Sequence, residues 1–141
     1  MPKPLPASQL YCLSVRQPWA DFIVLFVKDV ENRSFRTQYR GPLLIHASKT
    51  FEDEEGFTNR EAAAMKRAGL GHPLDYEPVG GAIVGTVDVV DCVTDHPSEY
   101  FEGRYGWVLK NAKRLRQPIP WKGAVGLFKV PATVMKGKRF F

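Results

Sequence analysis

Apolar residues in the first half of the chain recur with two different periods. Leu10–Val15 is a short, nearly continuous apolar run, which predicts a buried strand. Pro18 then suits a first helical position, and apolar residues follow it at helical spacing. They are Trp19, Phe22, Ile23 and Phe26. We therefore expect a core-facing helix of roughly ten residues that ends near Lys28.

Two further strands are expected before residue 50. Val30–Phe35 alternates well enough to be a strand, and a turn at Arg40–Pro42 follows it. Leu43–Ser48 then alternates so that His46 and Ser48 project from the same face of a mostly buried strand.

The second half begins with a helix signal and continues with strands. Thr58 and Glu61 fit a capping box, and an alanine-rich segment follows until Gly69 ends it. Leu70–Gly81 is rich in turn residues and predicts a surface loop. Strands are expected over Ala82–Cys92, Tyr105–Leu109 and Val125–Val130, with a proline-stiffened connection over Gln117–Trp121. No linker divides the chain, so we expect one α+β domain over residues 1–141, built round a small, strongly curved sheet or barrel.

Composition narrows the class of protein. The longest apolar stretch, Phe22–Val27, is six residues, far short of the roughly 20 that a membrane-spanning helix needs. Met1–Leu10 contains prolines and lacks the pattern of a secretory signal, so we expect a cytoplasmic protein without a membrane partner. Cys12 and Cys92 lack the spacing of a disulfide framework or a zinc site, and we expect neither a metal nor a cofactor.

Charge is distributed unevenly along the chain. The net charge of +5 is the sum of +4 over residues 1–50, −9 over residues 51–102 and +10 over residues 103–141. A positive face of this kind would attract a polyanion such as a nucleic-acid backbone, although basic side chains also serve solubility alone. The densest basic stretch contains Lys110, Lys113, Arg114, Arg116 and Lys122.

Three ordered segments resemble the activating-signal-cointegrator homology (ASCH) domain family. They are Leu13–Ala20, Lys28–Ser34 and Tyr39–Ser48. The family is similar to the pseudouridine-synthase and archaeosine-transglycosylase (PUA) domain, so the resemblance implies a PUA-like small β-barrel with peripheral α-helices and a cleft that faces RNA or nucleotides. The family motif GxKxxExR falls on Lys28, Glu31 and Arg33, with Phe26 in place of its glycine. We expect this departure to tighten the end of the helix.

The motif residues also have a chemical interpretation of their own. Glu31 and Arg33 project from one side of a strand, and Lys28 at the helix exit can reach the same point. The two cations could hold phosphate, while Glu31 could orient Lys28 or accept from a base amine or a sugar hydroxyl. The alternative is a surface ion-pair network of little energetic value. His46 could act as a general base, or could be a hydrogen-bonded core histidine.

Aromatic and basic side chains extend the candidate interface. Tyr105 and Trp107 alternate around a glycine near Lys110, a pattern suited to stacking unpaired bases. Trp19 could stack in the same way or belong to the core. The residues expected to contact nucleic acid are Trp19, Arg33, Arg40, Ser48, Lys49, Tyr105, Trp107 and Lys110.

The favoured function is therefore binding of RNA or single-stranded nucleic acid. Ribonuclease activity, with Lys28, Glu31 and His46 as catalytic residues, is an extension of it. The resemblance also implies an amidohydrolase that acts on an N4-acylated nucleoside, but Glu31 stands where that branch carries a threonine nucleophile. A protein-interaction module is a third possibility, and the oligomeric state is left open.

Overall fold

The computed structural model describes residues 5–52 and 56–141, so the first residues of Met1–Leu10 lie outside it. Its elements are β1 (Gln9–Gln17), α1 (Trp19–Val24), β2 (Val30–Arg33), β3 (Gly41–Phe51), α2 (Asn59–Arg67), β4 (Ala82–Val93), β5 (Tyr105–Pro120) and β6 (Leu127–Pro131). Short 3₁₀ turns lie at Pro73–Asp75 and Ala132–Met135. In this part of the chain, neither α-helix is long and apolar enough to cross a membrane.

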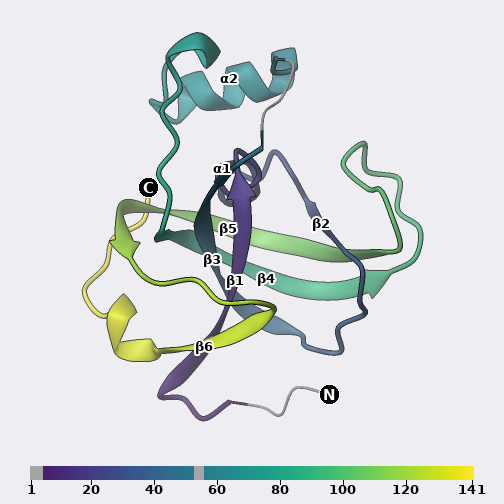
Figure 1. The fold of residues 1–141 in the computed structure, drawn as a ribbon, viewed down its shortest axis with the longest axis vertical. Coiled ribbons are helices and arrows are strands. Elements are labelled where there is room, and N and C mark those ends of the chain that lie inside the picture. Colours follow the sequence, from purple (N-terminus) through teal and green to yellow (C-terminus); the bar gives the residue numbers. More distant parts are fainter. Residues whose placement is uncertain (1–4, 53–55) are drawn as a thin grey trace.

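The strands form one mixed sheet in the order β2-β5-β4-β3-β1-β6. Strands β1 and β3 run parallel, and every other neighbouring pair is antiparallel. The α+β class is thus confirmed, and Figure 1 shows how strongly the long strands curve. Of the expected strongly curved sheet or barrel, the structure shows the curved sheet: β2 and β6 are the two edges of the described sheet, so it stays open and does not close into a barrel.

Alternation along β1 and β3 divides the apolar residues between two faces. One cluster joins Leu13 and Ile45 to residues of α1. The opposite cluster joins Cys12 and Leu44 to the C-terminal segment. Because side chains alternate across a strand, the polar residues that follow Cys12 and Leu44 by two positions share this second face. Ser14 and His46 are those residues, and they are partners in the β1–β3 register.

Helix α1 is shorter than expected because the chain leaves the helix at Phe26. Phe26 has a φ of 56°, in the left-handed region where glycine is favoured. The Val27 N–H donates to the Phe22 carbonyl over 2.9 Å, and the Phe26 N–H donates to the Ile23 carbonyl over 3.0 Å. These two bonds form a Schellman motif. The phenylalanine therefore keeps a glycine-type backbone, and the expected tightening of the helix end is replaced by an abrupt stop just before Lys28.

Two local predictions have different outcomes. The capping box of α2 is confirmed: the Thr58 side chain accepts from the Glu61 N–H, and the Glu61 carboxylate accepts from the Thr58 N–H. The expected connection over Gln117–Trp121 is instead mostly strand, because β5 runs on through Pro120. Its end pairs with the start of β4, where Ile119 lies opposite Ile83.

Candidate nucleic-acid interface

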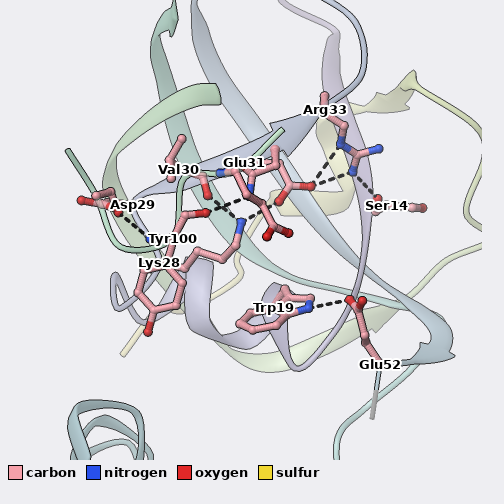
Figure 2. Close-up of polar contacts among 12 residues, drawn as sticks. Ser14, Trp19, Lys28, Asp29, Val30, Glu31, Arg33, Glu52 and Tyr100 are labelled. Atoms are coloured by element: carbon pink, nitrogen blue, oxygen red, sulfur yellow. Dashed lines mark hydrogen bonds and ion pairs between the residues drawn. The ribbon is translucent and has the colours of Figure 1, made fainter. Parts of the chain in front are cut away.

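A buried ion network occupies the exit of α1 and the edge strand β2 (Figure 2). The Lys28 Nζ donates to Glu31 Oε1 over 2.9 Å, and the Arg33 Nη2 and Nε donate to Glu31 Oε2 over 2.9 and 3.1 Å. Lys28 is 5% exposed and Glu31 is 7% exposed. These values exclude the alternative of solvent-exposed surface pairs.

Backbone geometry explains why the three side chains meet. Glu31 and Arg33 stand two residues apart on β2, so they share one side of the strand. Val30, between them and the helix, is fully buried and anchors the strand. Lys28 leaves the Schellman motif and turns back so that its Nζ also donates to the Val30 carbonyl. The network is therefore positioned by the end of α1, by the lysine that follows it and by the edge strand β2.

Two cationic side chains of the network have N–H groups with no assigned acceptor among the described residues. Among the described residues, no acceptor is assigned to Arg33 Nη1, while Arg33 Nη2 donates to the Ser14 carbonyl over 2.9 Å. Lys28 Nζ carries three protons, of which two are assigned, to Val30 and Glu31. Both side chains line a cavity of about 590 Å³. The network thus presents cationic donors to this cavity, which we call the cleft.

Two aromatic residues form a wall of the cleft. The rings of Trp19 and Tyr100 meet edge to face, with centroids 6.4 Å apart. The Trp19 Nε1 donates to Glu52 Oε2 over 2.6 Å, and the Tyr100 hydroxyl donates to Glu61 Oε2 over 2.7 Å. Burial, and then the hydrogen bond to Glu61, raise the pKa of Tyr100. Its hydroxyl therefore stays protonated at neutral pH and keeps its position.

The cleft carries more negative than positive charge. Among the residues that the structure describes, its basic lining residues are Arg16, Lys28 and Arg33, and its acidic ones are Glu31, Glu52, Glu61, Glu99 and Glu102, so their formal sum is 3 − 5 = −2. No residue after Glu102 lines the cleft. The basic segment 103–141 therefore supplies none of its wall, and a phosphate backbone would find little net attraction inside it.

His46 lies outside the cleft, in a second cavity of about 890 Å³ on the other side of Ser14. Its Nδ1 is 2.9 Å from the Ser14 Oγ, and its Nε2 is 2.7 Å from the Trp121 carbonyl oxygen. Ser48 and Lys49 line the same second cavity. The expected catalytic set of Lys28, Glu31 and His46 is thus divided between two cavities, and Ser14 is the one described residue that lines both.

The expected stacking residues on β5 do not form a platform. Trp107 is fully buried and meets the Phe35 ring edge to face, with centroids 5.7 Å apart, so the stacking prediction is wrong for it. Strand β5 pairs with both β2 and β4 at this level, which encloses the indole. Tyr105 is half-buried, with the Arg36 guanidinium 5.6 Å from its ring centroid.

Arg40 and Lys110 are also remote from both cavities. The Arg40 guanidinium donates to the carbonyl oxygens of Thr37 and Tyr39 and lies 3.6 Å from Asp91. Lys110 is exposed on β5, opposite Asp88 in the register. Neither lines the cleft or the second cavity. Of the residues expected to contact nucleic acid, only Trp19 and Arg33 line the cleft.

Sequence reasoning missed the acidic wall of the cleft. The sequence pattern indicates only a capping role for Glu61 and does not single out Tyr100 or Glu52. The available signal was the high density of acidic residues over 51–102. Within the described ranges, no three His, Cys, Asp or Glu side chains are placed to share a metal ion.

The fold and the cleft together define a small α+β domain in which a buried Lys–Glu–Arg network lines a ligand-sized cavity. The sequence model of the ASCH domain matches residues 13–119, and the chain belongs to this family. It is also similar to activating signal cointegrator 1 of Homo sapiens and of Mus musculus. Each is 27% identical over 139 residues, which cover 92% of this chain and 24% of the relative. The chain therefore spans about a quarter of the length of these relatives.

Proposed function

We propose that the domain binds RNA or single-stranded nucleic acid by taking one unpaired nucleoside into the cleft. The observation that carries this proposal is the network itself, whose Arg33 and Lys28 residues line a cavity of about 590 Å³. That volume lies in the usual range for small-ligand sites, roughly 300–1,000 Å³. The charged donors suit the carbonyl and ring-nitrogen acceptors of a base.

The charge of the wall selects the part of the nucleotide that enters. A net formal charge of −2 disfavours phosphates, whereas carboxylates accept from amines and sugar hydroxyls. The half-buried Trp19 ring supplies a flat surface on which a base can stack. Phosphates would then lie outside the cleft, near the exposed Arg16 at its rim. Membership in the ASCH family agrees with this proposal, because the family resemblance implies a cleft that faces RNA or nucleotides.

Catalysis is less well supported than binding. Both oxygens of Glu31 accept from cations, so this carboxylate is not free to take a proton from a sugar hydroxyl. His46 lines the other cavity. No hydroxyl occupies the position of the expected threonine nucleophile, since that residue is Glu31. We therefore propose nucleic-acid binding, with ribonuclease action and amide hydrolysis as outcomes for the test.

The test is a fluorescence-anisotropy titration with short, labelled single-stranded RNA over a salt series. Wild type is expected to bind at low salt, and Arg16→Ala to weaken binding by roughly threefold to tenfold. Arg104→Ala is the matched control, because Arg104 is exposed and lines neither cavity. Absence of binding by wild type at low salt would overturn the proposal and favour a protein-interaction role.

Gel analysis of the same mixtures decides whether RNA is cut. Intact RNA is the expected result. Cleavage by wild type that Glu31→Ala and Lys28→Ala abolish would instead establish the ribonuclease extension and contradict our account of Glu31. Cleavage that both variants retain equally would indicate a contaminating nuclease.

A further inference from the structure

Ser14 and His46 form a hydrogen-bonded pair that the nucleic-acid proposal does not use. They are direct partners in the parallel β1–β3 register, and Ser14 Oγ lies 2.9 Å from His46 Nδ1. Neighbouring residues in register on parallel strands point to the same face, so the sheet itself holds the two side chains together. Their spacing is that of a hydroxyl nucleophile and its general base.

The other imidazole nitrogen fixes the tautomer of His46. Its Nε2 is 2.7 Å from the Trp121 carbonyl oxygen, which can only accept a hydrogen bond. Nε2 therefore carries a proton, and Nδ1 of the neutral ring is left to accept from Ser14. His46 is 2% exposed, and the Phe128 ring meets it edge to face. The carbonyl and the packing together orient the imidazole, as a third residue does in a catalytic triad.

The pair lies at the wall of the second cavity, so the hydroxyl has a place to meet a substrate. Ser14 is half-buried and lines this space of about 890 Å³. Gly123, in the loop after β5, lies close beside the pair: a Cβ there would be 2.6 Å from Ser14 Oγ and 2.8 Å from His46 Cε1. Such distances are well inside van der Waals contact, so a side chain at residue 123 would displace or cover the serine.

The lining of the second cavity indicates the substrate class. Trp121 and Val125 contribute apolar surface, and Lys49 and Lys122 are the charged side chains. Within residues 5–52 and 56–141, no carboxylate lines this cavity. A ligand with an apolar body and a negative charge is therefore complementary to it.

We propose that Ser14 is the nucleophile of a second, acyl-transfer site, with His46 as its base and the Trp121 carbonyl as the orienting group. The substrate class is an ester that carries a negative charge. This activity goes beyond nucleic-acid binding and does not depend on it.

Acyl transfer at this site has an acylation step and a deacylation step. The Ser14 Oγ bonds to the ester carbonyl carbon while its proton passes to His46 Nδ1, giving a tetrahedral oxyanion. Collapse breaks the bond to the alkoxy oxygen, which leaves with the proton from Nδ1, and Ser14 is acylated. Water then attacks the acyl carbon with His46 again as base, releasing the carboxylic acid and restoring the serine.

Covalent labelling with an alkyl fluorophosphonate tests the nucleophile directly. In this reaction Ser14 Oγ bonds to phosphorus, fluoride leaves, and the serine proton passes through His46 to water. After labelling of the full, folded chain and digestion, peptide mass spectrometry is expected to find one adduct, on Ser14, in wild type and in Ser34→Ala. Ser14→Ala and His46→Gln are expected to lose it by more than tenfold in rate. No adduct on wild type, or equal labelling of His46→Gln, would overturn the proposal.

The Gly123→Ala variant distinguishes blocked access to Ser14 from a loss of labelling caused by misfolding. It keeps both reacting side chains but places a methyl group against Ser14 Oγ, so labelling should fall while the circular dichroism spectrum stays unchanged. Unchanged labelling of a folded Gly123→Ala protein would contradict the proposal that a substrate reaches the Ser14 hydroxyl from the second cavity.

Hydrolysis of 4-acetoxybenzoate against its neutral methyl ester tests the substrate class. Wild type should prefer the anionic ester, and Lys49→Ala with Lys122→Ala should remove the preference. Equal rates with both esters would overturn the anionic assignment.

RNA binding by Ser14→Ala separates the two proposals, because this change keeps the main-chain carbonyl that Arg33 contacts. Lost labelling with retained RNA binding is the expected combination.

Discussion

Arg33 donates from Nη2 to the main-chain carbonyl of Ser14 over 2.9 Å, and this bond joins two ends of an open sheet. Arg33 belongs to β2, at one edge, whereas Ser14 belongs to β1, next to the opposite edge. The curvature of the sheet brings these strands together without backbone pairing. The residue that accepts this bond, Ser14, also lines both the cleft and the second cavity.

Removing the shared carboxylate should destabilise the domain more than removing one of its cations. Glu31→Ala leaves Lys28 buried beside an unpaired Arg33, and we expect a loss of about 3 kcal/mol in the free energy of unfolding. Lys28→Met keeps the apolar stem and leaves the Glu31–Arg33 pair, so it should cost less. Urea denaturation measures both. A cost below about 1 kcal/mol for Glu31→Ala would mean that the network behaves like exposed ion pairs.

Phe26→Gly should stabilise the protein. The backbone at this position is left-handed, and a side chain there costs roughly 1 kcal/mol that glycine does not incur. Phe26 is 48% exposed, so little burial is lost with its ring. Phe26→Ala is the matched control, because it removes the ring and keeps the strain. Thermal unfolding should place Phe26→Gly above wild type and Phe26→Ala below it, and the reverse order would contradict the strain argument.

The sequence predicts the local structure better than the site. The capping box at Thr58 and the mostly buried strand around His46 need only neighbouring positions, and both are confirmed. The burial of Trp107 depends on two strands packed beside it, which local alternation does not reveal. The contact between His46 and Trp121 joins residues 75 positions apart, so no local pattern could indicate it.

The family motif indicates a cluster of charged side chains that hydrophobic periodicity does not reveal. It singled out Lys28, Glu31 and Arg33 together, and these side chains do meet in the structure. The acidic wall of the cleft comes from segments with no motif, such as the loop that carries Tyr100. Its position depends on how α2 and that loop pack over α1, a tertiary effect.

The two cysteines should differ in reactivity. Burial raises the pKa of Cys12 to about 12, so the thiolate fraction at pH 8 is on the order of one in 10⁴. Cys92 is only partly buried, on β4. Iodoacetamide should therefore modify Cys92 first in the folded protein, and Cys12 only once denaturant is added. Peptide mass spectrometry over time gives both rates, and comparable rates in the native protein would contradict the packing around Cys12.

Gly85→Ala should loosen α1 from the sheet. A Cβ at this position would lie 2.2 Å from the Lys113 carbonyl oxygen and 2.7 Å from Val24 Cγ1, so the helix or a strand must move. We expect a loss of about 2 kcal/mol. Gly103→Ala is the control, since nothing lies within 4 Å of its added Cβ and only its φ of +80° is unfavourable. Urea denaturation of both variants should show the larger cost at Gly85, and an equal or smaller cost would argue against this close contact.

The indole N–H signals of the three tryptophans show whether the nucleic acid binds in the cleft. Trp19 lines the cleft, Trp107 is fully buried, and Trp121 lines the second cavity, so each reports a different location. In a ¹H–¹⁵N correlation spectrum recorded during titration with a single-stranded trinucleotide RNA, we expect the Trp19 signal to shift while those of Trp107 and Trp121 stay in place. Movement of the Trp121 signal alone, or of none of the three under conditions where the RNA is bound, would contradict binding in the cleft.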